Sequence, residues 1–167
     1  MMRGLAVLAA LALAAPLAAP AAAQLVQDKP TLTLAAARII TDAAQAEADK
    51  RGLKVTIVVV DPGGVPIALR RMDNAPVAGP DIALGKAQTA ARFSNPTALF
   101  EQRLQKEGQT RYLTFPTMMV ASEGGLPVKR DGKTLGAVGV SGGTGQEDGL
   151  IAAAGVAAID AALAAAK

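Results

Sequence analysis

A glycine-rich loop that leads into an alanine-rich segment is the strongest chemical signal in this chain. Residues 142–145 read Gly-Gly-Thr-Gly, and acidic residues follow at once, as is typical of a first helical turn. Backbone N–H groups at the start of a helix bind carboxylates and phosphates. The spacing matches neither a Walker A loop nor a dinucleotide fingerprint. The residues singled out here for ligand binding are Ser141, Gly142, Gly143, Thr144 and Gly145.

Two interpretations of this loop stay open. It either holds an anionic group of a ligand, or it is a strand-to-helix connection whose cap is already satisfied. Nucleophilic catalysis by Ser141 would need a base, and the chain contains no His. Only a pairing with Lys86 would supply one, and no acid–base pair can be identified from the spacing. We therefore favour a binding function over catalysis.

Lys86 is the lone cation in the apolar middle of a helix expected over residues 81–93. If this side chain is buried, its ammonium group can bind an anionic ligand or act as a base. If it is not, its aliphatic stem lies over the sheet and its charged end reaches water. Asp61, within an Asp-Pro-Gly-Gly run, is better explained as a turn residue than as a catalytic one.

Composition excludes several classes of function. The formal net charge is only +3, and the basic residues are scattered instead of lining a stripe with aromatic side chains. We therefore expect no nucleic-acid binding. The absence of Cys rules out a disulfide framework, and the absence of His removes the commonest metal ligand. Glu147 and Asp148 are adjacent and would not share one helix face, so we expect no dedicated metal site.

Several elements must position these residues. Apolar spacing predicts helices over 33–51, 81–93, 95–108 and 146–166. β-branched or alternating runs predict five strands, over 54–60, 65–71, 117–121, 126–129 and 134–141. Asp131-Gly132 predicts a tight hairpin turn between the last two strands. This order predicts a mixed α+β fold in which helices cover a five-stranded sheet.

The first residues have the layout of an export signal. Arg3 precedes an apolar run, and the alanines that end at Ala23 form a typical cleavage site. We expect a signal peptide over 1–23 that is cleaved after Ala23, a short linker over 24–31 and a single domain over 32–167. The mature protein would then be periplasmic or secreted. We expect no later segment to be long and apolar enough to span a membrane.

Several ordered motifs resemble one protein family. They are GGLPVKRDGKTLGAVGVSGGTGQEDG at 124–149, VVVDPGGVPIALRRMDNA at 58–75, DIALGKAQTAARF at 81–93 and NPTALF at 95–100. Together they resemble the GlcG/HbpS family of small haem-binding-type proteins, from about Leu32 onward. The resemblance implies a profilin-like antiparallel five-stranded sheet flanked by helices. It also implies a homo-oligomer, because some family members form octamers, and haem or a related tetrapyrrole as ligand.

Haem would need axial ligands other than the histidine that some relatives use, since this chain has none. The resemblance directs attention to hydroxyls, because a threonine-type oxygen ligand has been inferred for another relative. The candidates are Tyr112, Thr114, Thr117, Met118 and Met119, with Met72 as a further thioether. Met118 and Met119 are equally typical of core filling.

Three functions therefore remain in competition. The first is an exported binding protein for haem or another small planar ligand that carries carboxylates. The second is an enzyme or accessory protein for small hydroxy acids of the glycolate-utilisation type, in which Lys86 and the glycine loop would grip a carboxylate. The third is a non-catalytic oligomeric scaffold.

Overall fold

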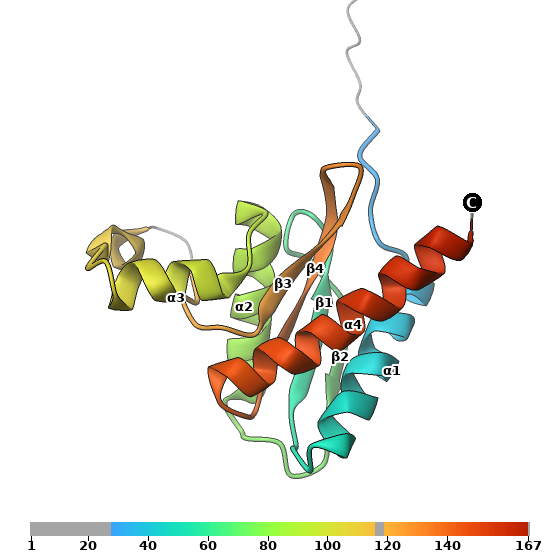
Figure 1. Cartoon of the computed structure of the whole chain (residues 1–167), viewed down its shortest axis with the longest axis horizontal. Helices are drawn as coiled ribbons and strands as arrows, with labels where there is room; N and C mark the ends of the chain where they lie inside the picture. Colours follow the sequence, from blue (N-terminus) through green and yellow to red (C-terminus); the bar gives the residue numbers. More distant parts are fainter. Residues whose placement is uncertain (1–27, 116–118, 167) are drawn as a thin grey trace, which may run out of the picture.

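Two antiparallel hairpins meet in the middle of one four-stranded sheet (Figure 1). The computed structural model describes residues 28–115 and 119–166, so the expected signal peptide and the candidates Thr117 and Met118 lie outside the described residues. The elements are α1 (Leu34–Lys50), β1 (Thr56–Val60), β2 (Pro66–Arg71), α2 (Gly79–Phe93), α3 (Thr97–Gln105), η1 (Thr110–Thr114), β3 (Gly125–Arg130), β4 (Lys133–Ser141) and α4 (Gly145–Ala165).

The strand order is β2-β1-β4-β3, and every neighbouring pair is antiparallel. The hairpins β1–β2 and β3–β4 are those expected, and β1 joins them by pairing with β4 from Thr56↔Ser141 to Val60↔Ala137. Asp131 and Gly132 both have positive φ, at 50° and 75°, as a tight turn of this kind requires. The predicted Asp-Gly turn is therefore confirmed.

The prediction of a fifth strand over 117–121 is wrong. Within the described residues there are four strands, and residues 119–121 belong to none of them. The backbone N–H of Val120 donates to the side-chain Oγ1 of Thr89 in α2 at 2.9 Å, instead of to a neighbouring strand. The Thr89 side chain thus accepts the hydrogen bond that a backbone carbonyl of a neighbouring strand would otherwise accept. The profilin-like description of the sheet stays a prediction.

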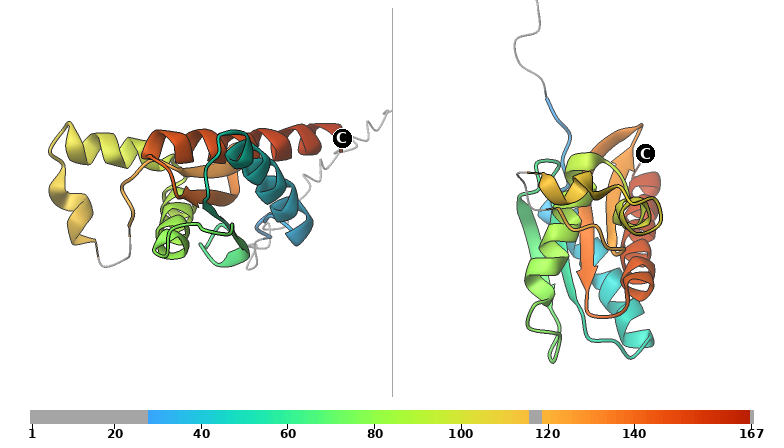
Figure 2. Two further views of the ribbon diagram at one scale, coloured as in Figure 1. Left: turned by 90° about the horizontal axis from the view of Figure 1, so that it is seen from below. Right: turned by 90° about the vertical axis from the view of Figure 1, so that its left-hand side faces the viewer.

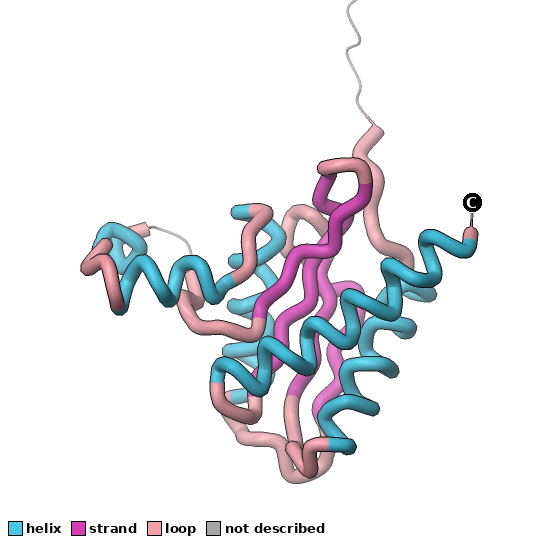
Figure 3. Tube along the Cα trace, in the orientation of Figure 1, coloured by secondary structure: helices cyan, strands magenta, loops and turns pink. Residues whose placement is uncertain are grey.

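Helices cover both faces of the sheet (Figures 2 and 3). All five residues of β1 are buried, and they alternate between the two faces. Ile57 and Val59 pack in one apolar cluster with α1 and α4, whereas Val58 and Val60 pack in another with α2. This double coverage explains why every residue of the β-branched run at 56–60 is buried.

Glycine in β4 allows α2 to lie unusually close to the sheet. A Cβ atom at Gly139 would overlap the carbonyl oxygen of Ala83 and approach the backbone N of Ala87 to 2.5 Å. Alanines on α2 complete the contact, with Ala83, Ala87 and Ala90 all fully buried. The glycine pattern of this strand therefore serves packing within one chain.

The expectation that no later segment is long and apolar enough to span a membrane is wrong for α4. The helix meets that test by length and composition. One face of α4 nevertheless packs in the apolar cluster that it shares with α1 and the sheet, through Ile151, Ala152 and Ile159. Part of its apolar character is therefore explained by its place over the sheet.

Candidate functional site

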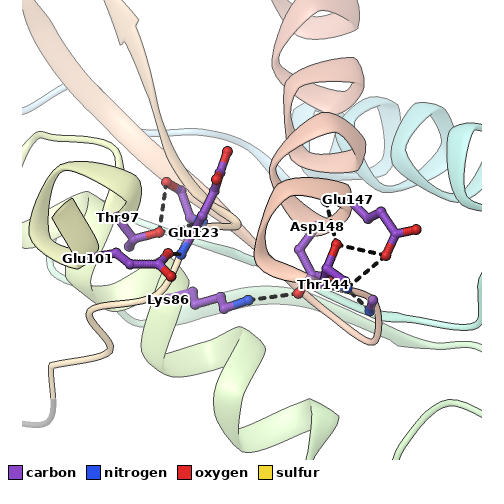
Figure 4. Close-up of polar contacts among 9 residues, drawn as sticks. Lys86, Thr97, Glu101, Glu123, Thr144, Glu147 and Asp148 are labelled. Carbon is purple, nitrogen blue, oxygen red and sulfur yellow. Dashed lines mark hydrogen bonds and ion pairs between the residues drawn. The ribbon is translucent and has the colours of Figure 1, made fainter. Parts of the chain in front are cut away.

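Lys86 is buried and forms an ion pair with Asp148. Its Nζ atom lies 2.8 Å from Oδ2 of Asp148, and the two side chains are 3% and 2% exposed (Figure 4). Lys86 comes from the middle of α2 and Asp148 from the first turn of α4, on opposite faces of the sheet. The pair therefore links the two helical layers at the end of the sheet where β3 begins.

Gly124 provides the room for this ion pair. The residue has φ at +124°, and a Cβ atom there would lie 2.8 Å from Nζ of Lys86, Cβ of Asp148 and the carbonyl oxygen of Val140. The adjacent Gly125 is packed equally closely, with the carbonyl of Lys86 at 2.5 Å from the position of a Cβ. Gly124 thus leaves room for the Lys86 side chain, and Gly125 leaves room for the backbone of α2 at Lys86 and for Thr97.

The glycine loop is also engaged by carboxylates of the chain itself. The N–H of Gly143 donates to Oδ1 of Asp148 at 2.9 Å, and the N–H of Thr144 donates to Oε2 of Glu147 at 2.8 Å. Thr144 and Glu147 form a reciprocal capping box at the start of α4. The hydrogen bond from the Thr144 backbone is the main cause that lowers the pKa of Glu147.

Lys86 and Gly143 therefore do share one carboxylate, but that carboxylate belongs to Asp148. This is the arrangement expected for an anion site, with an internal anion in the place of an external one. A ligand would have to displace Asp148, and a buried carboxylate without partners is strongly destabilising. Asp148 was not identified from the sequence as the partner of Lys86. The available signal was the lone lysine on an apolar helix face, because a buried lysine requires an acidic partner.

The remaining loop candidates do not converge on a common point. Ser141 is 7% exposed at the end of β4, and Gly142 packs against the backbone of Lys54 and Val55. Gly145 lies beside Glu123 and helps to line an open cleft of about 410 Å³ between α3 and the start of α4. The cleft is polar, and its lining residues are Ala98, Glu101, Gln102, Gln105, Lys106, Glu123, Gly145 and Gln146.

Hydrogen bonds to side chains of α3 hold the segment before β3 in place. The N–H of Gly125 donates to Oγ1 of Thr97 at 2.9 Å, and the N–H of Glu123 donates to Oε2 of Glu101 at 2.6 Å. Figure 4 shows both side chains reaching from α3 toward this segment. They fix the segment that carries Gly124, and hence the passage for Lys86.

A second group of candidate side chains lies on the arm, which we define as residues 97–115. The arm consists of α3 and η1, and it projects beyond the sheet (Figures 1 and 2). The chain has three Phe, one Tyr and no Trp, and all four aromatic rings meet at this arm. Their centroids lie 5.2–6.0 Å apart in the pairs Phe93–Phe100, Phe93–Phe115, Phe100–Tyr112 and Tyr112–Phe115. We call these four residues the aromatic cluster.

The phenol oxygen of Tyr112 lies in a dense polar network. It accepts hydrogen bonds from Nη1 of Arg103 at 3.1 Å and Nη2 of Arg111 at 3.2 Å, and it donates to Oε1 of Gln109 at 3.3 Å. The hydrogen bond from Arg111 is the main cause that lowers the pKa of Tyr112, and Arg103 acts in the same direction. The Arg111 guanidinium also lies 5.1 Å from the ring centroid of Tyr112.

The structure brings several haem-ligand candidates to this arm. Tyr112 is 6% exposed within the aromatic cluster, and Thr114 is exposed at the end of η1, where its hydroxyl donates to the carbonyl of Arg111 at 2.8 Å. Met119 is half-buried in the segment that follows. Met72 lies apart from them, in the apolar cluster shared with α1 and α4.

Two large apolar side chains of the arm are exposed to solvent. Leu113 is 69% exposed and Phe115 is 37% exposed. Exposed apolar side chains on an element that also carries charged groups are a feature of many binding surfaces. The arm thus combines an apolar surface, two guanidinium groups and a phenol oxygen.

The fold and these residues define a small α+β domain with a projecting aromatic arm, and comparison with known proteins identifies the family. The family model described as "Haem degrading protein HbpS-like" matches residues 32–157. The chain is 42% identical over 129 residues to an uncharacterized 15.0 kDa protein of Citrobacter freundii, covering 75% of this chain and 90% of that one. It is 41% identical over 116 residues to protein GlcG of Escherichia coli K12, covering 69% and 84%. The chain therefore belongs to the HbpS-like family.

Solved structures agree with this assignment. Protein ORFY of Klebsiella pneumoniae superposes with a TM-score of 0.78 at 34% identity, covering 84% of this chain and 99% of that one. An HbpS double mutant from Streptomyces reticuli gives 0.75 at 34% identity, covering 85% and 97%. A complex of PduOC with haem gives 0.69 at 28% identity, covering 77% and 94%.

Removing one partner of the buried ion pair should destabilise the fold more than removing both. We expect Lys86→Met to lower the free energy of unfolding by about 3 kcal/mol, because it leaves the Asp148 carboxylate buried and unpaired. The double variant Lys86→Met/Asp148→Asn should recover part of this loss, since an amide oxygen still accepts from Gly143. Urea denaturation of the parent, both single variants and the double variant measures the coupling.

The surface pair Glu47–Arg51 provides the matched control. Its charged atoms lie 2.6 Å apart, but the side chains are 19% and 33% exposed. Arg51→Met should therefore cost less than about 1 kcal/mol. Equal losses for Lys86→Met and Arg51→Met, or a double variant equal to the sum of the singles, would contradict a coupled buried pair.

The pH dependence of stability should reveal the burial of Asp148. Desolvation is the main cause that raises the pKa of this carboxyl above its usual value, while Lys86 and the Gly143 amide oppose it. As the pH falls, the Asp148 carboxyl is therefore protonated at a higher pH in the native state than in the unfolded state. The free energy of unfolding of the parent, relative to that of Asp148→Asn, should therefore increase from pH 7 down toward about pH 4. A relative free energy that decreases over this range would show that the ion pair outweighs desolvation.

Proposed function

We propose that this protein binds haem or a related tetrapyrrole on the arm. The observation that carries the proposal is the aromatic cluster with its exposed apolar surface and two arginines, in a family one of whose relatives, PduOC, has been crystallised with haem. Binding is the step that both carrying and degrading haem require, so it is the common function to test in an HbpS-like protein.

The residues of the arm fit such a ligand. Haem is a large, planar, mostly apolar ring with two carboxylates, and it supplies an iron with axial coordination positions. Leu113 and Phe115 offer apolar contact, and each is partly exposed. Arg103 and Arg111 lie on the same arm, where each donates one hydrogen bond to the Tyr112 oxygen, and the remaining N–H groups of a guanidinium can bind carboxylates. Tyrosine is one of the established protein ligands of haem iron.

The glycine loop supports binding less well. A small hydroxy acid gripped by Lys86 and Gly143 would compete with Asp148, which already contacts both at 2.8 and 2.9 Å. Displacing it would leave that carboxylate buried and unpaired. We therefore place the ligand on the arm and give the loop a structural role.

Titration of the purified protein with haemin tests this proposal. We expect a shifted Soret band that saturates at a fixed number of haemin molecules per chain. Leu113→Asp should raise Kd about tenfold or more, because burying a leucine side chain is worth about 1.5–3 kcal/mol. Val77→Asp is the matched control, since Val77 is also apolar and 87% exposed but lies in the loop before α2.

Two outcomes would overturn the proposal in different ways. Spectra of free haemin alone, at micromolar protein, would remove the binding function. Equal weakening by Leu113→Asp and Val77→Asp would retain the function but remove the arm as its site.

We also propose that the protein acts as an exported homo-oligomer. The leader pattern that ends at Ala23 supports export.

Exposed apolar side chains on the outer helical layer support association, with Leu34 at 49%, Ile39 at 38% and Leu150 at 45% exposure. Mass spectrometry of the protein from an exporting host should give a chain that begins at Gln24, and light scattering should give more than one chain per particle. An uncleaved leader would contradict export, and a monomer would contradict association.

A further inference from the structure

The phenol oxygen of Tyr112 has an environment built for negative charge. Two guanidinium groups donate to it, from Arg103 on α3 at 3.1 Å and from Arg111 on η1 at 3.2 Å. The donors come from two different elements that converge on one atom. Both donors are cationic, and two positive charges at one oxygen stabilise the phenolate form of this side chain relative to the neutral phenol.

The third partner of the phenol oxygen, Gln109, is an acceptor and not a donor. Gln109 accepts the phenol proton through Oε1 at 3.3 Å, the longest of the three contacts. This contact exists only while the proton is present, since a phenolate has no proton to donate. Loss of the proton therefore frees one lone pair of the oxygen, while both arginines continue to stabilise its charge.

The ring of Tyr112 is packed against two other rings of the aromatic cluster. It packs edge-on against Phe100 at 5.5 Å and Phe115 at 5.8 Å. Phe115 and the neighbouring Leu113 are the exposed apolar side chains of the arm. The Tyr112 ring thus contacts one of the exposed apolar residues of the arm, Phe115, in a chain that has neither His nor Cys as an alternative iron ligand.

We propose that Tyr112 is the axial oxygen ligand of ferric haem in this protein, with Arg103 and Arg111 as positioning residues that stabilise its phenolate. This inference rests on the proposed binding of haem. Ferric iron is a hard Lewis acid and accepts an anionic oxygen ligand well. Thr114 is the weaker oxygen, because its hydroxyl is neutral and already donates to the carbonyl of Arg111.

Absorption and resonance Raman spectra of the haemin-loaded protein test the ligand directly. The parent should show a phenolate-to-iron charge-transfer band, together with tyrosinate vibrations enhanced by excitation in that band. Tyr112→Phe retains the ring of the aromatic cluster and should lose both signals, with a Kd for haemin raised about tenfold or more. Thr114→Val and Met119→Leu remove the other described candidates and should leave both signals unchanged.

A second variant keeps the test decisive if Tyr112→Phe disturbs the arm. Arg111 is exposed, and Arg111→Gln removes one donor from the phenolate and should shift the charge-transfer band. Arg130→Gln, on the exposed end of β3, is the matched control and should leave the band in place.

The possible failures are distinguishable. A parent protein without a shifted Soret band removes both the proposed function and this inference. A parent that binds haemin but lacks the tyrosinate signals, or that retains them in Tyr112→Phe, keeps the proposed function and overturns Tyr112 as the ligand. Loss of the signals in Thr114→Val or Met119→Leu would overturn it as well.

Discussion

The buried carboxylate of Asp148 is the constraint on which this structure depends most. It accepts from a lysine of α2 and from a backbone amide of the glycine loop, and so it ties together two helices that lie on opposite faces of the sheet. An ionised pair that is 2–3% exposed is tolerated only when both charges are well matched. Gly124, Gly125 and the hydrogen bonds to side chains of α3 are arranged around that requirement.

Because of this constraint, the residues that hold the fold together differ from those that are available to bind a ligand. The loop with the strongest anion-binding pattern is held by the chain's own carboxylates, at Asp148 and Glu147. The chemistry left for a ligand lies on the arm, where every aromatic ring of the chain is gathered. The sheet core, by contrast, consists of aliphatic side chains and alanine, which pack closely between the covering helices. A rigid body and a projecting arm are thus made from different residue types.

Local sequence patterns predicted most of the architecture. Apolar spacing predicted α1, a β-branched run predicted β1, and Asp131-Gly132 predicted the turn of the β3–β4 hairpin, because each of these signals depends on neighbouring residues alone. The fifth strand was wrong because the side chain of Thr89, distant in sequence, takes the Val120 amide. Asp148 was missed for the same reason: its partner lies 62 residues away, and its position in a first helical turn already had a local explanation. The gathering of Arg103, Arg111 and Tyr112 likewise depends on how η1 folds back toward α3.

The most direct measurement of the central claim is a crystal structure of the haemin complex, with the iron located from its anomalous scattering. The account predicts one strong iron peak at the arm, within bonding distance of the Tyr112 phenol oxygen, and an undisturbed Lys86–Asp148 pair. An iron peak beside the glycine loop, with Asp148 displaced from Lys86, would contradict it.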